Sequence, residues 1–166
     1  MTGLDDPVIP IGVLAQKVGL SVSAIRRYEK EGLVISHRRG SGHRFFSYED
    51  IQRVRAIQHM IQDLGLNIEG IRRIQALLPC WNLQRCTSEV RSRCPAYRGE
   101  SAPCWVVKGR ACSPDPEKCR GCPVYRFGSL CTERIKQLVF EQSGVQCDDV
   151  AAQELVRRLR RLQQED

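Results

Sequence analysis

The hydrophobic pattern at the start of the chain predicts two short helices. Ile11, Leu14, Ala15 and Val18 recur at the i, i+3, i+4, i+7 spacing that places side chains on one helical face. Gly19 follows them as a predicted C-cap, because glycine readily adopts the left-handed conformation that ends many helices. The first predicted helix therefore ends just before Gly19.

The second predicted helix covers about residues 22–31, with Ser21 as its N-cap and Gly32 at its end. Val22 and Ile25 face the first helix. The outward side carries Arg26, Arg27 and Lys30. Two short helices joined by a tight glycine-containing turn, the second one basic, are typical of a helix-turn-helix. A solvated basic face is the alternative interpretation.

A basic β-hairpin is predicted directly after these helices. The stretch "VISHRRGSGHRFFSYED" has a strand pattern on either side of a turn at residues 40–42. The charged or titratable side chains around it are His37, Arg38, Arg39, His43 and Arg44. A hairpin in this position is a wing, whose arginines can contact phosphates or a minor groove.

Two further helices complete this first module. Ser47 and Asp50 have the spacing of a capping box at the start of the third helix. Its predicted apolar stripe is Val54, Ile57, Ile61 and Leu64. Gly65 ends that helix and Asn67 caps the fourth, whose predicted stripe is Ile68, Ile71, Ile74 and Leu78.

The motifs "IRRYEKEGL", "R..GSGHRFFSYED" and "L..LG.....I" make residues 9–78 resemble the DNA-binding domain of the MerR family of transcription regulators. The resemblance implies a dimer that binds a promoter operator in double-stranded DNA, acts with RNA polymerase and twists or bends the promoter. Carried over by position, the implied DNA contacts are Arg26, Arg27 and Tyr28 in the second helix and Arg44 in the wing, with Arg39 and His43 beside it. Ser23 and Lys30 of the second helix and Arg38 of the hairpin are further predicted DNA contacts.

Two of these residues have alternative roles. Tyr28 is equally suited to a core position between helix and wing. For Arg44 the alternative is a salt bridge with Glu49 or Asp50, which is less favoured than a DNA contact because the whole hairpin is basic. The chain also departs from the family pattern: Arg27 and Phe46 stand where the family often has tyrosine. The first change adds positive charge, which favours contacts with the DNA backbone.

The net charge of +7 favours an anionic partner, with nucleic acid ahead of a membrane surface. No apolar run approaches the ~20 residues that span a bilayer. The N-terminal "MTGLDDPVIPIG" lacks the basic and apolar regions of a signal peptide. We therefore expect a cytoplasmic protein without a membrane partner.

The nine cysteines divide the chain. None precedes Cys80, eight lie between Cys80 and Cys131, and Cys147 stands alone. We predict a mainly α protein: an N-terminal tail over 1–8, a winged helix-turn-helix domain over 9–78, a small Cys-rich effector domain over 79–131 stapled by a metal or cluster, and C-terminal helices over 132–166. The apolar stripe of the last helix suits a dimer interface.

Dense cysteine in a reducing compartment indicates metal binding or redox chemistry more often than structural disulfides. Cys119-Arg-Gly-Cys122 is a C-x-x-C turn that presents two thiolates to one metal. The first predicted ligand set is Cys104, Cys112, Cys119 and Cys122; the second set is Cys80, Cys86, Cys94 and Cys131. Cys147 is predicted to be a buried apolar residue.

The pattern C-P-x-Y occurs at residues 94–97 and 122–125, a short echo in a chain without another evident repeat. The long irregular spacings and the Cys-Pro steps favour an iron–sulfur cluster over zinc, although iron–sulfur relatives in the family have a shorter run of four cysteines. Trp81 and Trp105 each follow a cysteine. They are expected to shield the sulfurs from water, and simple packing is the alternative role.

Several functions remain open at this level. The preferred one is a MerR-like regulator that senses redox state or metal through its Cys-rich domain. The alternatives are a regulator with a purely structural zinc site and a regulator with a thiol–disulfide switch. A thiol oxidoreductase using Cys119 and Cys122 is disfavoured, because the βαβ context of such enzymes is missing. We predict that the protein is not an enzyme.

Overall fold

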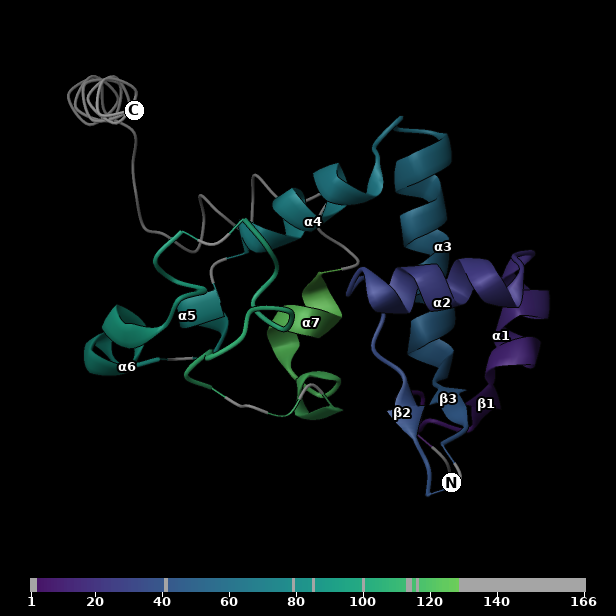
Figure 1. The fold of residues 1–166 in the computed structure, drawn as a ribbon, viewed down its shortest axis with the longest axis horizontal. Coiled ribbons are helices and arrows are strands. Elements are labelled where there is room, and N and C mark those ends of the chain that lie inside the picture. The colour runs from purple at the N-terminus through teal and green to yellow at the C-terminus, as the bar shows by residue number, and fades with distance from the viewer. Residues whose placement is uncertain are drawn as a thin grey trace. The chain divides into compact units, whose positions relative to one another are not determined.

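The computed structural model describes residues 3–40, 42–78, 80–84, 86–99, 101–112, 115 and 117–128. All of them belong to one compact unit, residues 1–135. The predicted ligand Cys131, the predicted core residue Cys147 and the predicted C-terminal helices over 132–166 lie outside the described residues. The part of the chain in Figure 1 that carries labels is mainly helical.

Helices α1 (Ile11–Val18) and α2 (Val22–Lys30) form the predicted helix-turn-helix. Gly19 caps α1 in the left-handed region, at φ 70°. The Ser21 side chain caps α2 by accepting a hydrogen bond from the amide of Ala24 at 3.1 Å. Both caps confirm the boundaries expected from the sequence.

The wing belongs to a three-stranded antiparallel sheet of β1 (Ile9–Pro10), β2 (His37–Arg38) and β3 (Arg44–Phe46). The strand order is β1-β3-β2, with Ile9 opposite Phe46 and His37 opposite Phe45. The hairpin of β2 and β3 confirms the prediction. Strand β1 was not predicted, because two residues are too few to show an alternating pattern.

Helix α3 (Tyr48–Gln62) begins with the predicted capping box of Ser47 and Asp50. Helix α4 (Ile68–Ala76) begins at Asn67, whose side chain accepts from the amide of Gly70 at 2.7 Å. The prediction for Leu64 was wrong. This residue lies beyond the end of α3 and is 49% exposed, because the helix stops before the apolar stripe does.

The helices and the sheet of residues 9–78 share one hydrophobic core. Its fully buried members include Leu14 from α1, Ile25 from α2, Phe46 from β3 and Val54 and Ile57 from α3. The α2 and wing segments therefore pack into the same hydrophobic core.

The cysteine-rich stretch contains only short elements. They are α5 (Cys80–Leu83), α6 (Ser88–Arg93), a 3₁₀ turn over Glu117–Cys119 and α7 (Pro123–Phe127). This agrees with the absence of a long apolar stripe. A second hydrophobic cluster consists of Leu78, Trp105, Cys119, Val124 and Tyr125. The stretch has its own small core but lies in the same compact unit as residues 9–78.

Candidate nucleic-acid interface and thiol cluster

The exposed side of α2 is polar and positively charged. Ser23, Arg26, Arg27 and Lys30 are all exposed. Within the described residues, none of the cations Arg26, Arg27 and Lys30 forms an ion pair. All three are therefore available to an anionic partner. Tyr28 differs: it is 8% exposed and belongs to the hydrophobic core. Its burial favours the packing role over a DNA contact and raises the pKa of its hydroxyl.

Glu29 connects the wing to helix α2. Its carboxylate accepts from Ser36 Oγ at 2.5 Å and from Arg44 Nε at 2.6 Å. Arg38 lies 3.6 Å away on the same carboxylate. Arg44 therefore has a salt bridge, but with Glu29 and not with the Glu49 or Asp50 considered from the sequence.

The remaining wing residues are more open. Arg39 is exposed, with its guanidinium 4.2 Å from the ring centroid of Phe45 and a hydrogen bond to the carbonyl of Pro7 at 3.2 Å. His43 is exposed at the turn of the hairpin. The α2 face and the wing thus present cations from two elements held together by Glu29, which suits contact with a phosphate backbone.

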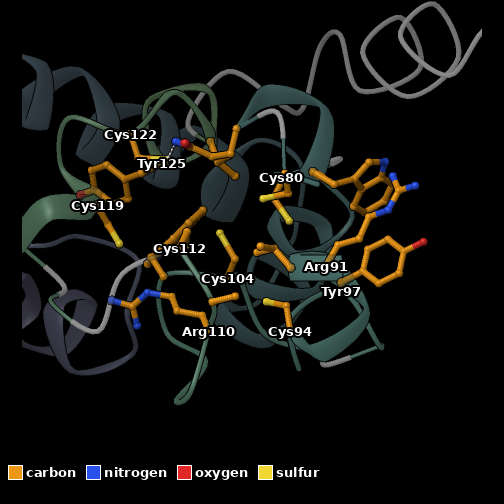
Figure 2. A pocket seen from close by; sticks show the side chains of 17 residues that line it. Cys80, Arg91, Cys94, Tyr97, Cys104, Arg110, Cys112, Cys119, Cys122 and Tyr125 are labelled. Carbon is orange, nitrogen blue, oxygen red and sulfur yellow. Dashed lines mark hydrogen bonds between the residues drawn. The ribbon is translucent and has the colours of Figure 1, made fainter. Parts of the chain in front are cut away.

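Seven cysteines line one small cavity of about 30 Å³ in the Cys-rich stretch (Figure 2). They are Cys80, Cys86, Cys94, Cys104, Cys112, Cys119 and Cys122. This arrangement mixes the two ligand sets expected from the sequence, since members of both face the same space. Trp81 and Trp105 also line the cavity, in keeping with their expected position beside the sulfurs.

All seven are free thiols, and they influence one another. The interaction between the thiols of Cys80 and Cys104 lowers the pKa of Cys80 to about 7 and raises the pKa of Cys104. Burial raises the pKa of Cys119, although the positive charge of Arg110 acts to lower it. The amide nitrogen of Gln84 lies 2.7 Å from Cys122 Sγ and donates to it.

The donor set has the chemistry of a soft-metal site, because thiolates are the preferred ligands of zinc and of iron–sulfur clusters. Among the residues that the structure describes, no three His, Cys, Asp or Glu side chains are gathered closely enough to hold a metal ion. The thiols therefore share a cavity without forming a ready coordination shell. Binding would require small movements of these short segments.

The winged helix-turn-helix geometry of the first module agrees with comparison to known proteins. Residues 9–78 match the model of the MerR HTH family regulatory protein. Residues 9–78 are a MerR-family helix-turn-helix domain. We refer to them below as the MerR domain. None of the described helices is long and apolar enough to cross a membrane.

Individual relatives resemble the same part of the chain. The putative heat shock protein HspR of Streptomyces coelicolor is 41% identical over 70 residues, which are 42% of this chain and 46% of that protein. The regulator GlnR of Bacillus anthracis is 35% identical over 68 residues, 41% of this chain and 52% of that protein. The regulator HmrR of Rhizobium leguminosarum bv. viciae is 32% identical over 81 residues, 49% and 60% respectively. The chain spans about half the length of these relatives.

The Cys-rich stretch contacts the MerR domain through the α2–wing connection (residues 32–38). The amide of Ile35 donates to the hydroxyl of Tyr125 at 2.9 Å, and Arg120 donates to the carbonyl of Ile35. Glu117 accepts from the amide of Arg38 at 3.1 Å and lies 3.1 Å from His37 Nδ1. The segment that contains the C-x-x-C turn (residues 117–128) is thus fastened to the connection at three points.

The loop around Trp105 approaches the start of the same connection. Trp105 is 3% exposed, and its indole nitrogen donates to the carbonyl of Gly32 at 2.7 Å. Gly32 has φ 76°, and a Cβ there would lie 2.4 Å from Val106 Cγ2. Only glycine accommodates both this backbone conformation and this approach without strain.

Helix α3 provides the second contact surface. Arg53 is 2% exposed; it donates to the carbonyls of Leu33, at 2.6 Å, and of Tyr125, and its guanidinium lies 3.7 Å from the ring centroid of Tyr125. Asp50 accepts from Arg120 at 2.8 Å, in addition to its capping role. The ion pair of Glu49 and Arg126 adds an exposed contact.

These contacts were not found by sequence reasoning. Arg53 and Arg120 read as ordinary surface arginines, and Glu29 as one residue of a charged helix. Their partners lie far along the chain, so no local spacing indicates them. One indirect signal of these contacts is present in the sequence. Trp105 and Tyr125 each belong to a pattern that follows a cysteine, and both make hydrogen bonds with the α2–wing connection.

Proposed function

We propose that this chain is a cytoplasmic, MerR-type transcription regulator in which a thiolate-bound metal centre controls the interaction with promoter DNA. The preferred centre is an iron–sulfur cluster, and zinc is the alternative. The observation that carries the proposal is the contact between the thiol-bearing segment 117–128 and the α2–wing connection. It joins the candidate sensor directly to the candidate DNA-reading elements.

The DNA-binding role rests on the MerR domain and its exposed cations. Arg26, Arg27 and Lys30 on α2 would contact the phosphate backbone and base edges of a double-stranded operator. Arg38, Arg39 and His43 on the wing would add contacts beside them, and Arg44 would orient the wing through Glu29. By family resemblance the protein acts as a homodimer together with RNA polymerase.

The sensing role rests on the cavity lined by seven thiols. When bound, a metal centre would hold several short segments together through strong bonds that a small apolar core cannot replace. The residues of the chain would then have separate roles. Cysteines would bind the metal, the Gln84 amide would donate a hydrogen bond to the sulfur of Cys122, and Trp81 and Trp105 would limit the access of water to the cavity.

Transmission would run through the α2–wing connection. A change in the thiol site shifts segment 117–128, which holds Ile35 and Arg38 by hydrogen bonds and Asp50 by an ion pair. Because Ile35 lies between α2 and the wing and Arg38 lies in strand β2 of the wing, such a shift would change the angle between the two DNA-reading elements. The local event at the thiols thereby becomes a change in DNA affinity or promoter geometry.

The test begins with selection of an operator from random DNA by the anaerobically purified full chain. Affinity for that operator is then measured for loaded, metal-free and oxidised protein. We expect at least a tenfold difference between loaded and metal-free protein, equivalent to about 1.4 kcal/mol. Equal affinities of all forms would instead indicate a structural zinc site. A difference only after oxidation, without metal, would indicate a disulfide switch.

The enzymatic alternative has its own outcome. Thiol–disulfide turnover by wild type, retained in Arg26→Ala, together with no selectable operator, would make the chain a thiol oxidoreductase and refute the regulatory role.

A further inference from the structure

The Cys-rich stretch contains two copies of one motif. Each copy opens with a Cys-Trp pair and closes with Cys-Pro-x-Tyr. The first copy runs from Cys80-Trp81 to Cys94–Tyr97, and the second from Cys104-Trp105 to Cys122–Tyr125. The two halves of this motif are each visible in the sequence, but only their contacts in the structure join them into one unit.

The two copies share an aromatic contact. Trp81 packs edge-on against Tyr97, with ring centroids 5.1 Å apart and planes at 89°. Trp105 packs edge-on against Tyr125 at 5.3 Å and 90°. A chance recurrence of four letters would not reproduce this pairing of aromatic rings.

The backbone before each proline also agrees. Cys94 has φ −81° and ψ 119°, and Cys122 has φ −76° and ψ 131°. The residue before a proline is confined to this extended region, so the backbone has a similar conformation at Cys94 and at Cys122. Together with the aromatic contacts, this supports pairing Cys94 with Cys122 and Cys80 with Cys104.

The two copies meet at their first cysteines. Cys80 and Cys104 both line the cavity, and each shifts the pKa of the other. Figure 2 shows the labelled side chains of Cys80, Cys94 and Cys104 around one space, with Cys122 farther away beside Tyr125; Cys122 lines the same cavity. Each copy therefore contributes two thiols to the same cavity: Cys80 and Cys94 from the first copy, Cys104 and Cys122 from the second.

The other cysteines of the cavity do not follow the motif. Cys86 lies six residues after Cys80, whereas Cys112 lies eight residues after Cys104 and is exposed. Cys119 has no counterpart in the first copy. It is 6% exposed in the second hydrophobic cluster, and its Sγ lies 3.9 Å from the carbonyl of Asp115.

We propose that Cys80, Cys94, Cys104 and Cys122 are the four ligands of one tetrathiolate metal centre, two from each copy of the motif. The inference rests on the proposed function and names its ligands. Each thiol releases its proton to solvent as the thiolate binds the metal. Cys119, although part of the C-x-x-C turn, is a packing residue and not a ligand.

The experiment measures bound metal in the full-length chain. Wild type and single serine variants are purified anaerobically, and iron, acid-labile sulfide and zinc are assayed per chain. Iron with equal sulfide identifies a cluster, and zinc without sulfide identifies a mononuclear site. We expect Cys80→Ser, Cys94→Ser, Cys104→Ser and Cys122→Ser to lose the bound metal to background. The matched controls Cys112→Ser and Cys119→Ser face the same cavity and keep the wild-type content.

Loss of metal in Cys119→Ser with retention in Cys80→Ser would overturn the ligand set, as would retention in any of the four. Because a serine variant can lose metal by misfolding, Cys80→His provides a second check. Histidine can replace a cysteine as a zinc ligand, so the variant should bind Co²⁺ with a weaker thiolate-to-metal absorption band than wild type. An unchanged band would count against Cys80.

These results are separable from those on the proposed function. Metal content that depends on the four cysteines, with operator affinity that does not depend on metal, would retain the ligand set and refute the sensor. Operator affinity that depends on metal held by other cysteines would retain the sensor and refute the ligand set.

Discussion

The hydroxyl of Tyr125 offers a narrow test of the contact between the Cys-rich stretch and the MerR domain. Tyr125→Phe removes one oxygen atom and leaves the ring, so the edge-on contact with Trp105 and the guanidinium of Arg53 over the ring both remain. The lost partner is the acceptor for the amide of Ile35 at 2.9 Å. Tyr125 is 4% exposed, so water cannot easily take its place.

The expected magnitude follows from this single unsatisfied donor. Leaving a buried amide without its acceptor costs about 1–3 kcal/mol. For a chain of this size the cost lowers the midpoint of thermal unfolding by roughly 2–4 °C per kcal/mol. We therefore expect a loss of about 2 kcal/mol, measured by urea unfolding of the loaded protein with coincident fluorescence and circular dichroism signals.

The equivalent tyrosine of the first motif copy is the matched control. Tyr97 has the same aromatic neighbour type, but it is 41% exposed. Tyr97→Phe should change stability by less than about 0.5 kcal/mol. Equal stabilities of Tyr125→Phe and wild type would refute the reasoning, because the contact with Ile35 would then contribute nothing.

Two further predictions concern the DNA-binding surface. Arg26→Ala should weaken operator binding and reduce the slope of log affinity against log salt by about 0.9, the value for one lost phosphate contact; an unchanged slope in a fluorescence anisotropy titration would exclude that contact. Glu29→Gln should lower the free energy of unfolding by about 1–2 kcal/mol, since it weakens a charged hydrogen bond to Arg44, and should steepen the salt slope, since it releases that cation towards DNA. A stable variant with an unaltered slope would contradict the assigned role of Glu29.

The MerR domain could be predicted in detail because its signals are local. Helix caps at Ser21, Ser47 and Asn67 and the apolar spacings in α1 and α3 each depend on neighbouring residues, and the structure confirms them. The error at Leu64 has the same origin. Its spacing continues the stripe, but the helix has already ended, and periodicity does not register where capping stops a helix.

Only the types of residue in the thiol site could be predicted from the sequence, and not their arrangement in space. Its arrangement depends on contacts between distant positions, such as Ile35 with Tyr125, ninety residues apart. The C-x-x-C turn favoured grouping Cys119 with Cys122 because their spacing is short. In the structure Cys94, Cys119 and Cys122 all line the same cavity. The proposed ligand set instead groups Cys122 with Cys94, whose shared Cys-Pro-x-Tyr pattern gains support from the aromatic contact that each tyrosine makes with a tryptophan.

The central claim is that the thiol centre controls the MerR domain. The most direct measurement is the affinity of the full-length chain for its selected operator, with and without the bound metal, at one fixed salt concentration. The account predicts at least a tenfold difference in wild type that is reduced in Tyr125→Phe and preserved in Tyr97→Phe. Identical affinities of the loaded and metal-free wild-type protein would contradict it.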